Sequence, residues 1–465
     1  MANLVYFSSK RIPNYMLLIL ILLANVILGY SLVHQNYNII IFFFSIFLVL
    51  IVVKSNVIPI VILLSIPPFF DWAVEYSFIP QQIMWIPEIL AGMLFIKALV
   101  SKLVWKEKVN LFGMKIVLVF LTIGFISIIY NSTNLISAFL FLRLLLRYYL
   151  LFLAVLNLDI DEEIMRMFNK IIVFIFIAQL ILSIVKLFVY GQGEISLGLS
   201  SHSVSTIFPL IAIGFLLAYY FLYKRLKIYI LLILGFIGFA LIGGKRAFVF
   251  FLPVLLMFLL WFLKDNFKLM FKYVVLGILI VSVSTYFSIK LMPTLNPQRE
   301  IGGEFNPKHV LDYVYNYTTG VTDSGMSIGR MSATISIFNQ LYQRGINRFL
   351  LGFGPGNIMK SAFQSYDESQ QLRAEYGIGY GMSGLNWLAL QVGYLGTFIY
   401  LLLYYFILRK SIYYFKKETE PYWRGFGLGM SAFSFIMLLL SLLYMTSFTS
   451  DAISAFYFCL AGFVL

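Results

Sequence analysis

The stretch from Lys227 to Leu263 reads KIYILLILGFIGFALIGGKRAFVFFLPVLLMFLLWFL. It consists of two apolar runs, 227–243 and 247–263, joined by a short turn that contains Lys245 and Arg246. Each run approaches the roughly 20 apolar residues that a helix needs to cross the hydrocarbon core of a bilayer. We therefore expect two consecutive membrane-spanning helices here.

Similar apolar runs recur along most of the chain. Of its 465 residues, 61% are hydrophobic and only 12% are charged, and the mean hydropathy is +0.91. A soluble domain has about 45–50% apolar and about 25% charged residues. The sequence therefore predicts an all-α polytopic membrane protein with about 12–14 transmembrane helices. The other runs lie at residues 14–33, which we expect to be retained rather than cleaved, and at 38–53, 56–70, 84–100, 111–130, 136–158, 167–188, 204–223, 270–290, 386–408, 425–446 and 450–465.

One long polar interval, residues 291–385, interrupts this pattern. The chain is thus expected to have three parts. Residues 1–290 form a bundle of about 11 transmembrane helices, residues 291–385 form a large extracytoplasmic loop containing short helices, and residues 386–465 add about three further transmembrane helices.

The distribution of basic residues predicts the orientation. The net charge is +14, yet the long loop holds equal numbers of basic and acidic residues, so the excess lies in short turns such as 97–108, 224–227 and 264–272. Basic turns between spans are typically cytoplasmic. We therefore expect both termini in the cytoplasm, the long loop outside, the lipid bilayer as the surrounding partner, and no nucleic acid as a partner.

The sequence gives no sign of a metal or cofactor site. The single cysteine, Cys459, lies in the last apolar run, which excludes a disulfide framework and a cysteine-based metal site. No HxxH or HExxH spacing occurs. We expect chemistry without a metal or a cofactor.

The turn containing Lys245 and Arg246 is expected at the outer surface, where topology rules disfavour basic residues. Its two preceding glycines allow close approach, and the guanidinium of Arg246 offers a planar fork suited to a phosphate. The alternative is a turn whose long side chains contact lipid headgroups.

Arg143 and Arg147 lie four residues apart in the apolar run FLFLRLLLRYYLLFL, and so on one helix face. Each costs at least about 2.5–3.5 kcal/mol at mid-bilayer, so both must face a wet or paired interior. They are either substrate-binding residues or a structural pair held by helix ends or by Glu88.

Within the long loop, Ser327 as N-cap and helical spacing of Met331, Ile335, Phe338 and Tyr342 predict a helix. Arg330 then lies in its first turn, where the helix dipole already supplies positive potential. An arginine there indicates a shared anion, unless it pairs with Asp323.

Other polar motifs offer less specific candidates. His202 is expected at the outer mouth of a span, where it could act as an acid or base near neutral pH or simply be solvated. The turn GFGPGN, which includes Gly354 and Gly356, could present amides to an anion or serve only as a turn. The segment DYVYNY, residues 312–317, could stack on sugar rings or form a loop core.

In this order and spacing, the motifs resemble those of the O-antigen ligase and polymerase superfamily, the Wzy and WaaL type of membrane glycosyltransferase with a GT-C-like fold. The resemblance rests on GGKRAFVFFLPVLL from Gly243, on the arginine-led loop helix that runs into the G-x-G-x-G turn, and on NWLALQVGYLGTF from Asn386. Arg246 and Arg330 match the two arginines that hold the diphosphate of the lipid-linked sugar donor.

The resemblance implies an inverting, metal-independent enzyme of a bacterial cytoplasmic membrane whose active site faces outward. As a polymerase of O-antigen, capsule or exopolysaccharide, it would transfer glycan from undecaprenyl diphosphate to the next lipid-linked repeat unit, with flippase and chain-length regulator proteins as partners. Arg246, Arg330 and His202 would be catalytic, and Arg143, Arg147, Lys245, Gly354, Gly356 and Asn386 would bind substrate.

Two other functions remain open at this stage. A ligase of the same superfamily would transfer the glycan to a lipid or protein acceptor, but such ligases commonly have a histidine where this chain has Leu385. A polysaccharide flippase or transporter would fit the many helices and the intramembrane arginines. Its expected internal pseudo-symmetry is not found in the sequence.

Overall fold

The computed structural model describes residues 48–76, 78–79, 81–158, 160–190, 198–199, 204–242, 246–263, 282, 286, 289–290, 295–298, 300, 302–304, 306–320, 329–357, 383–444 and 450–465. The chain divides into two units, Met1–Pro59 and Ile60–Leu465. In the first unit, residues 48–54 are helical, and the Oγ of Ser55 accepts hydrogen bonds from the amides of Val57 and Ile58 at 3.1 and 3.2 Å. Ser55 thereby caps the helix that follows.

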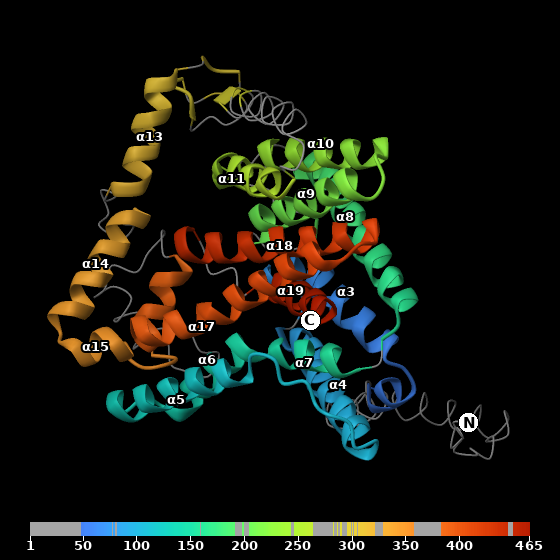
Figure 1. Cartoon of the computed structure of the whole chain (residues 1–465). Coiled ribbons are helices and arrows are strands. Elements are labelled where there is room, and N and C mark those ends of the chain that lie inside the picture. The colour runs from blue at the N-terminus through green and yellow to red at the C-terminus, as the bar shows by residue number, and fades with distance from the viewer. Residues whose placement is uncertain are drawn as a thin grey trace, which may run out of the picture. The chain divides into compact units, whose positions relative to one another are not determined.

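Every regular element among the described residues is a helix (Figure 1). The elements are α3 (Val57–Glu75), the 3₁₀ turn η1 (Gln81–Met84), α4 (Trp85–Val104), α5 (Met114–Asn131), α6 (Leu135–Leu146), α7 (Tyr149–Asn157), α8 (Glu162–Tyr190), α9 (Val204–Leu222), α10 (Lys227–Ile242), α11 (Arg246–Phe262), α13 (Pro307–Thr319), α14 (Arg330–Gln343), α15 (Ile346–Leu351), α17 (Gly384–Lys417), α18 (Pro421–Leu443) and α19 (Asp451–Val464).

Six of the described helices are long and apolar enough to cross a membrane, and α6 with α7 would make a seventh span if that bent pair is counted as one. The prediction of an all-helical polytopic membrane protein is confirmed. The predicted total of about 12–14 spans stays a prediction, because the runs at 14–33 and at most of 38–53 and 270–290 lie outside the described residues.

The run predicted as one continuous helix over 136–158 is instead bent by 44° between α6 and α7. The break falls at Arg147 and Tyr148, whose side chains are both drawn into contact with Asp451 at the start of α19. Polar contacts of this kind compensate the backbone at a break within a span.

Glycines allow α18 to pack closely on two neighbours. Cβ atoms added to Gly425 and Gly429 would lie 2.9 and 2.3 Å from the rings of Tyr219 and Phe215 on α9, whereas one added to Gly427 would lie 3.0 Å from the backbone of Phe415 on α17. Small residues four apart on one helix face are typical of close helix contacts in membranes. They place α18 between α9 and α17 (Figure 1).

The described part of the long polar interval contains α13, α14 and α15. Helices α14 and α15 pack against the first part of α17, and α15 also contacts α5. Helix α17 is broken at Gly393, whose backbone has φ 69° and ψ 178°, a conformation that strongly favours glycine. The break lets residues 350–354 approach α17 directly.

Candidate functional site

The two arginines of the expected diphosphate site each open a helix. Arg246 is the first residue of α11, and Arg330 is the first residue of α14. Of Arg246 only the backbone position is described, and Lys245, His202 and Asp323 lie outside the described residues. Because the N-terminal amides of a helix lack intrahelical acceptors, each arginine lies where the backbone already favours an anion.

Tyr444, which directly follows α18, connects these two helix starts. The Nε of Arg330 donates to the carbonyl oxygen of Tyr444 at 3.1 Å, and its guanidinium lies 4.1 Å from the centre of the Tyr444 ring. The same ring lies 5.8 Å from that of Phe251 in α11. Phe251 is about 7.5 Å along the helix axis from Arg246. The beginnings of α11 and α14 therefore lie at the same end of α18.

Asn386 joins the post-loop helix to the first turn of α14. Its Nδ2 donates to the Oγ1 of Thr334 at 2.9 Å, and that hydroxyl donates to the carbonyl oxygen of Arg330 at 2.8 Å. The side chain of Ser383 caps α17 by accepting from the Asn386 amide. The structure thus brings together Arg330 and Asn386, two residues that the motif resemblance predicts to belong to one site.

The side-chain oxygen of Asn386 is a buried polar group in need of a partner. Asn386 is fully buried, and its Oδ1 has no hydrogen-bond partner among the described residues. A buried acceptor without a donor costs about 1–3 kcal/mol. Its position one hydroxyl away from the Arg330 backbone makes it a candidate acceptor for a ligand hydroxyl.

The helix predicted from the loop sequence is confirmed, but the predicted N-cap is wrong. The N-cap is Gly329 rather than Ser327, so α14 begins at Arg330 itself. The residues at helical spacing, such as Phe338, are exposed, and the buried face consists of Ala333, Ile337 and Leu341. Ile337 and Leu341 pack against α17 because Ala389 and Leu390 supply the matching apolar surface there.

The turn GFGPGN docks against α17 and α5. The amides of Phe353 and Gly354 donate to the carbonyl oxygens of Leu390 and Gln391 at 2.8 and 3.1 Å, and the amide of Gly356 donates to the Oε1 of Gln391 at 2.6 Å. These amides therefore already donate hydrogen bonds within the protein. Substrate binding by Gly354 and Gly356 stays a prediction.

Space also restricts this turn. A Cβ on Gly354 would lie 2.0 Å from the Oγ1 of Thr133, and one on Gly356 would lie 2.2 Å from the carbonyl oxygen of Ser137. The turn fills the gap beside the α5–α6 connection, and the side chain of Arg348 also donates to Asn131 there. The arrangement accounts for a structural role of both glycines.

Arg143 and Arg147 form an ion-pair network with two carboxylates. Arg143 contacts Glu88 at 2.7 Å, and Arg147 contacts Glu88 at 2.9 Å and Asp451 at 2.6 Å. The hydroxyl of Tyr148 donates to Asp451 at 3.0 Å. Two positive and two negative groups balance each other here, which corresponds to the structural alternative raised from the sequence. Substrate binding by the two arginines stays a prediction.

Two residues of these sites were not anticipated. Asp451 was missed because it is far from Arg147 in the sequence. Tyr444 was missed because aromatic residues are common at the ends of apolar runs. An aromatic side chain two residues before the polar turn TSFTSD begins would have been the available signal, since aromatic residues are common at span ends. No periodicity links either residue to its arginine.

Among the described residues, no group of three or more histidine, cysteine, aspartate or glutamate side chains could hold a metal ion. Comparison of the chain with protein-family models, with curated proteins and with solved structures finds no match. The functional assignment therefore depends on the geometry and on the motifs.

Proposed function

We propose that this chain is a polysaccharide polymerase of a bacterial cytoplasmic membrane, with its site on the extracytoplasmic side. It would transfer glycan from an undecaprenyl-diphosphate carrier to the next lipid-linked repeat unit. The observation that carries this proposal is the contact of Tyr444 with both α11 and α14, each of which begins with an arginine.

Two helix N-termini at the same end of α18, each with an arginine as its first residue, favour a ligand with several negative oxygens. Helix N-termini bind phosphates through unpaired amides and the dipole, and arginine forms bidentate hydrogen bonds with phosphate oxygens. A lipid diphosphate matches this chemistry better than a single carboxylate, because it offers two phosphates to two arginines. The motif resemblance to the O-antigen polymerase and ligase superfamily supports the same ligand.

The proposed reaction is a single displacement at the anomeric carbon. The oxygen of an acceptor hydroxyl forms a bond to that carbon while its bond to the diphosphate oxygen breaks. The electron pair leaves with the diphosphate, the hydroxyl proton passes to a base, and the configuration inverts. Arg246 and Arg330 would stabilise the charge that develops on the leaving oxygen, which is where a preorganised positive group lowers the barrier most.

Two polar groups complete the proposed site. The buried Oδ1 of Asn386 would accept a hydrogen bond from a sugar hydroxyl. His202, or an acid such as Asp323, would take the acceptor proton. Leu385, beside Asn386, cannot perform that step, and this residue favours a polymerase over a ligase.

Deletion of the gene in the source bacterium tests the proposal against its alternatives. A polymerase defect leaves surface glycan that carries a single repeat unit, visible as loss of the ladder on a stained gel. Loss of all attached glycan would instead indicate a ligase. Accumulation of the lipid-linked repeat unit on the cytoplasmic side would indicate a flippase.

The orientation can be tested with introduced cysteines, since the only native cysteine, Cys459, is buried. We expect Tyr342→Cys in α14 to react with a membrane-impermeant maleimide in spheroplasts, and Lys416→Cys at the end of α17 to react only after lysis. Both positions are exposed. Labelling in the opposite sense would place the site in the cytoplasm and contradict the proposal.

A further inference from the structure

A cavity lies at the other end of α18 from the arginine site. It has a volume of about 460 Å³ and is bounded by α8, α9, α10, α18 and α19. Tyr422 lines it at the start of α18, whereas Tyr444 follows the end of that helix. Twenty-two residues of helix correspond to about 33 Å, close to the roughly 30 Å thickness of a bilayer core. The cavity therefore lies near the opposite membrane surface, on the side predicted to be cytoplasmic.

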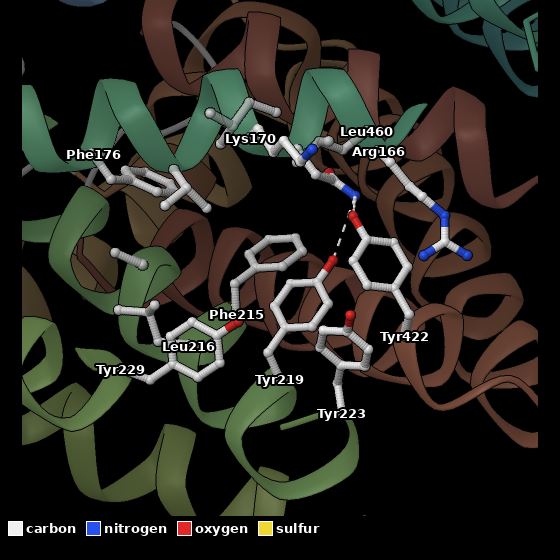
Figure 2. A pocket seen from close by; sticks show the side chains of 14 residues that line it. Arg166, Lys170, Phe176, Phe215, Leu216, Tyr219, Tyr223, Tyr229, Tyr422 and Leu460 are labelled. Atoms are coloured by element: carbon white, nitrogen blue, oxygen red, sulfur yellow. Dashed lines mark hydrogen bonds between the residues drawn. The ribbon is translucent and has the colours of Figure 1, made fainter. Parts of the chain in front are cut away.

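The cavity has an aromatic, hydroxyl-bearing side and an apolar side (Figure 2). Four tyrosines surround one part of it, and the Nδ2 of Asn169 donates to the hydroxyl oxygens of Tyr219 and Tyr422 at 3.4 and 2.9 Å. The hydroxyls of Tyr219 and Tyr422 also lie within hydrogen-bonding distance of each other, so these three side chains form one polar cluster on this side of the cavity. The apolar side is formed by Ile172, Val173, Phe176, Phe215, Leu216 and Leu460.

The apolar side ends inside the helix bundle. Beyond Phe176 and Leu460, the adjoining side chains of α8, α9, α18 and α19 leave no room for a water molecule. The cavity is thus closed at its inner end and reaches the surface near the helix ends. A ligand would enter with an apolar part first and leave its polar part at the surface.

Arg166 supports the wall rather than the interior of the cavity. Its guanidinium lies 2.5 Å from Glu420 and 4.5 Å from the centre of the Tyr422 ring. In Figure 2 it extends away from the centre of the cavity, beyond Tyr422. Its charge is therefore balanced by Glu420, and it holds Tyr422 in place.

Other basic residues surround the mouth. Tyr223 and Tyr229 line the cavity, so the α9–α10 turn between them, with Lys224, Arg225 and Lys227, lies at its rim. Lys170 on α8 lines the cavity and is exposed. No ion pair joins any of these four basic side chains to a carboxylate of the described residues. The mouth is positively charged, while the interior is apolar.

The geometry points to a binding site for an anionic phospholipid of the cytoplasmic leaflet, with one chain in the cavity and the negatively charged headgroup at the basic rim. The volume falls within the range of about 300–1,000 Å³ that is usual for ligand sites. Basic residues near the cytoplasmic membrane surface attract anionic lipids by about 1 kcal/mol each. This site does not depend on the proposed polymerase activity, because none of its residues belongs to the arginine site.

Lipid retention by the purified full-length protein tests the site. The delipidated protein is titrated with phosphatidylglycerol, or with phosphatidylcholine carrying the same chains, and bound lipid is counted by native mass spectrometry. We expect phosphatidylglycerol to bind about tenfold more tightly. Inorganic phosphate at millimolar concentration should not displace it, because the chain supplies part of the affinity.

Paired variants locate the binding. Val173→Trp should fill the cavity and weaken phosphatidylglycerol binding about tenfold, whereas Phe174→Trp, at the neighbouring exposed position, should not. Lys170→Gln combined with Lys227→Gln should remove the preference for the anionic lipid, whereas Lys416→Gln with Lys417→Gln, on the same side of the membrane, should keep it. Monodisperse elution and an unchanged thermal midpoint establish that each variant is folded.

Equal binding of the two lipids would overturn the proposal, as would unchanged binding to a folded Val173→Trp variant. Should that variant fail to fold, Leu216→Trp fills the same cavity from α9 and carries the same expectation. Displacement of phosphatidylglycerol by inorganic phosphate would identify a soluble anion as the ligand and would also contradict a lipid site.

Discussion

Two places in the molecule set an arginine against a tyrosine ring, and they differ in what else the arginine contacts. Arg147 lies 5.2 Å from the ring of Tyr148 and contacts the carboxylates of Glu88 and Asp451. Arg330 lies 4.1 Å from the ring of Tyr444 and donates to that residue's carbonyl oxygen at the start of a helix. The first arrangement joins α4, α7 and α19 by opposite charges, whereas the second adds positive charge to a helix N-terminus.

We expect this difference to distinguish an arginine that stabilises the fold from one that contributes to the proposed function. A buried arginine between carboxylates has its charge matched inside the protein, and its removal is felt as lost stability. An arginine at a helix N-terminus increases a positive potential that only an anion relieves. Substitution of Arg147 should therefore mainly lower the thermal midpoint, whereas substitution of Arg330 should mainly lower the amount of polymer.

Arg147→Ala should have the largest effect on stability. Only 6% of the Arg147 side chain is exposed, and its loss leaves Asp451 buried without its ion-pair partner. Removing one member of a buried pair costs about 3–5 kcal/mol, so we expect a large fall in the thermal midpoint of the protein in detergent. Adding Asp451→Asn to this variant should recover part of the loss. An unchanged thermal midpoint for Arg147→Ala would contradict the structural role of this arginine.

Arg330→Ala should lower the thermal midpoint less than Arg147→Ala does, and it should reduce polymer by about 10²–10³-fold, the usual effect of losing one group that stabilises a developing negative charge. Arg330→Lys should restore only part of the polymer, since lysine lacks the bidentate fork. The measurement is surface glycan at equal protein level. Arg344→Ala, at the other end of α14, is the matched control and should behave like wild type. A normal amount of polymer from the Arg330→Ala variant would contradict the proposed role of Arg330 in the reaction.

Gly354→Ala should lower stability by about 1–3 kcal/mol, because its φ of +107° disfavours a side chain and the added Cβ would meet Thr133. Gly92→Ala is the control, since nothing lies within 4 Å of a Cβ at that position. A smaller effect for Gly354→Ala than for Gly92→Ala would show that the turn is not held as described. Thermal unfolding in detergent measures both.

Asn386→Leu should reduce polymer about tenfold, since it removes the hydrogen bond to Thr334 and the buried acceptor together. Thr334→Val removes only the hydrogen bonds of the hydroxyl and should have a smaller effect. The comparison of the two variants, again by surface glycan at equal protein level, separates positioning of α14 from contact with substrate. Wild-type polymer from Asn386→Leu would exclude both roles.

The sequence alone predicted much of the helical architecture but few of the contacts between residues on different helices. The lengths of the apolar runs predicted most helices, and the spacing of apolar residues after Arg330 predicted a helix that begins near it. The sequence did not show which face of α14 is buried, because both faces of this helix carry apolar residues. The position of α17 decides that Ile337 and Leu341 are buried and that Phe338 is exposed.

Local sequence patterns did not identify most of the residues that contact each other across different helices. Glu88 was named as a partner for Arg143 and Arg147, but Asp451 was not, because nothing in the last apolar run marks it as the neighbour of α7. Likewise, the sequence around Gly354 predicts a tight turn but not the hydrogen bonds of its amides to α17 at Gln391. Contacts between distant helices depend on how the bundle assembles.

The most direct test of the proposed function uses the purified protein in liposomes with the lipid-linked repeat unit isolated from a polymerase-deficient strain of the source bacterium. That lipid serves as both donor and acceptor, and no nucleotide sugar is added. We predict a ladder of products that lengthens by one repeat unit per step and is absent with Arg330→Ala. Transfer only to an added lipid or protein acceptor, or a ladder that persists in Arg330→Ala, would contradict the account.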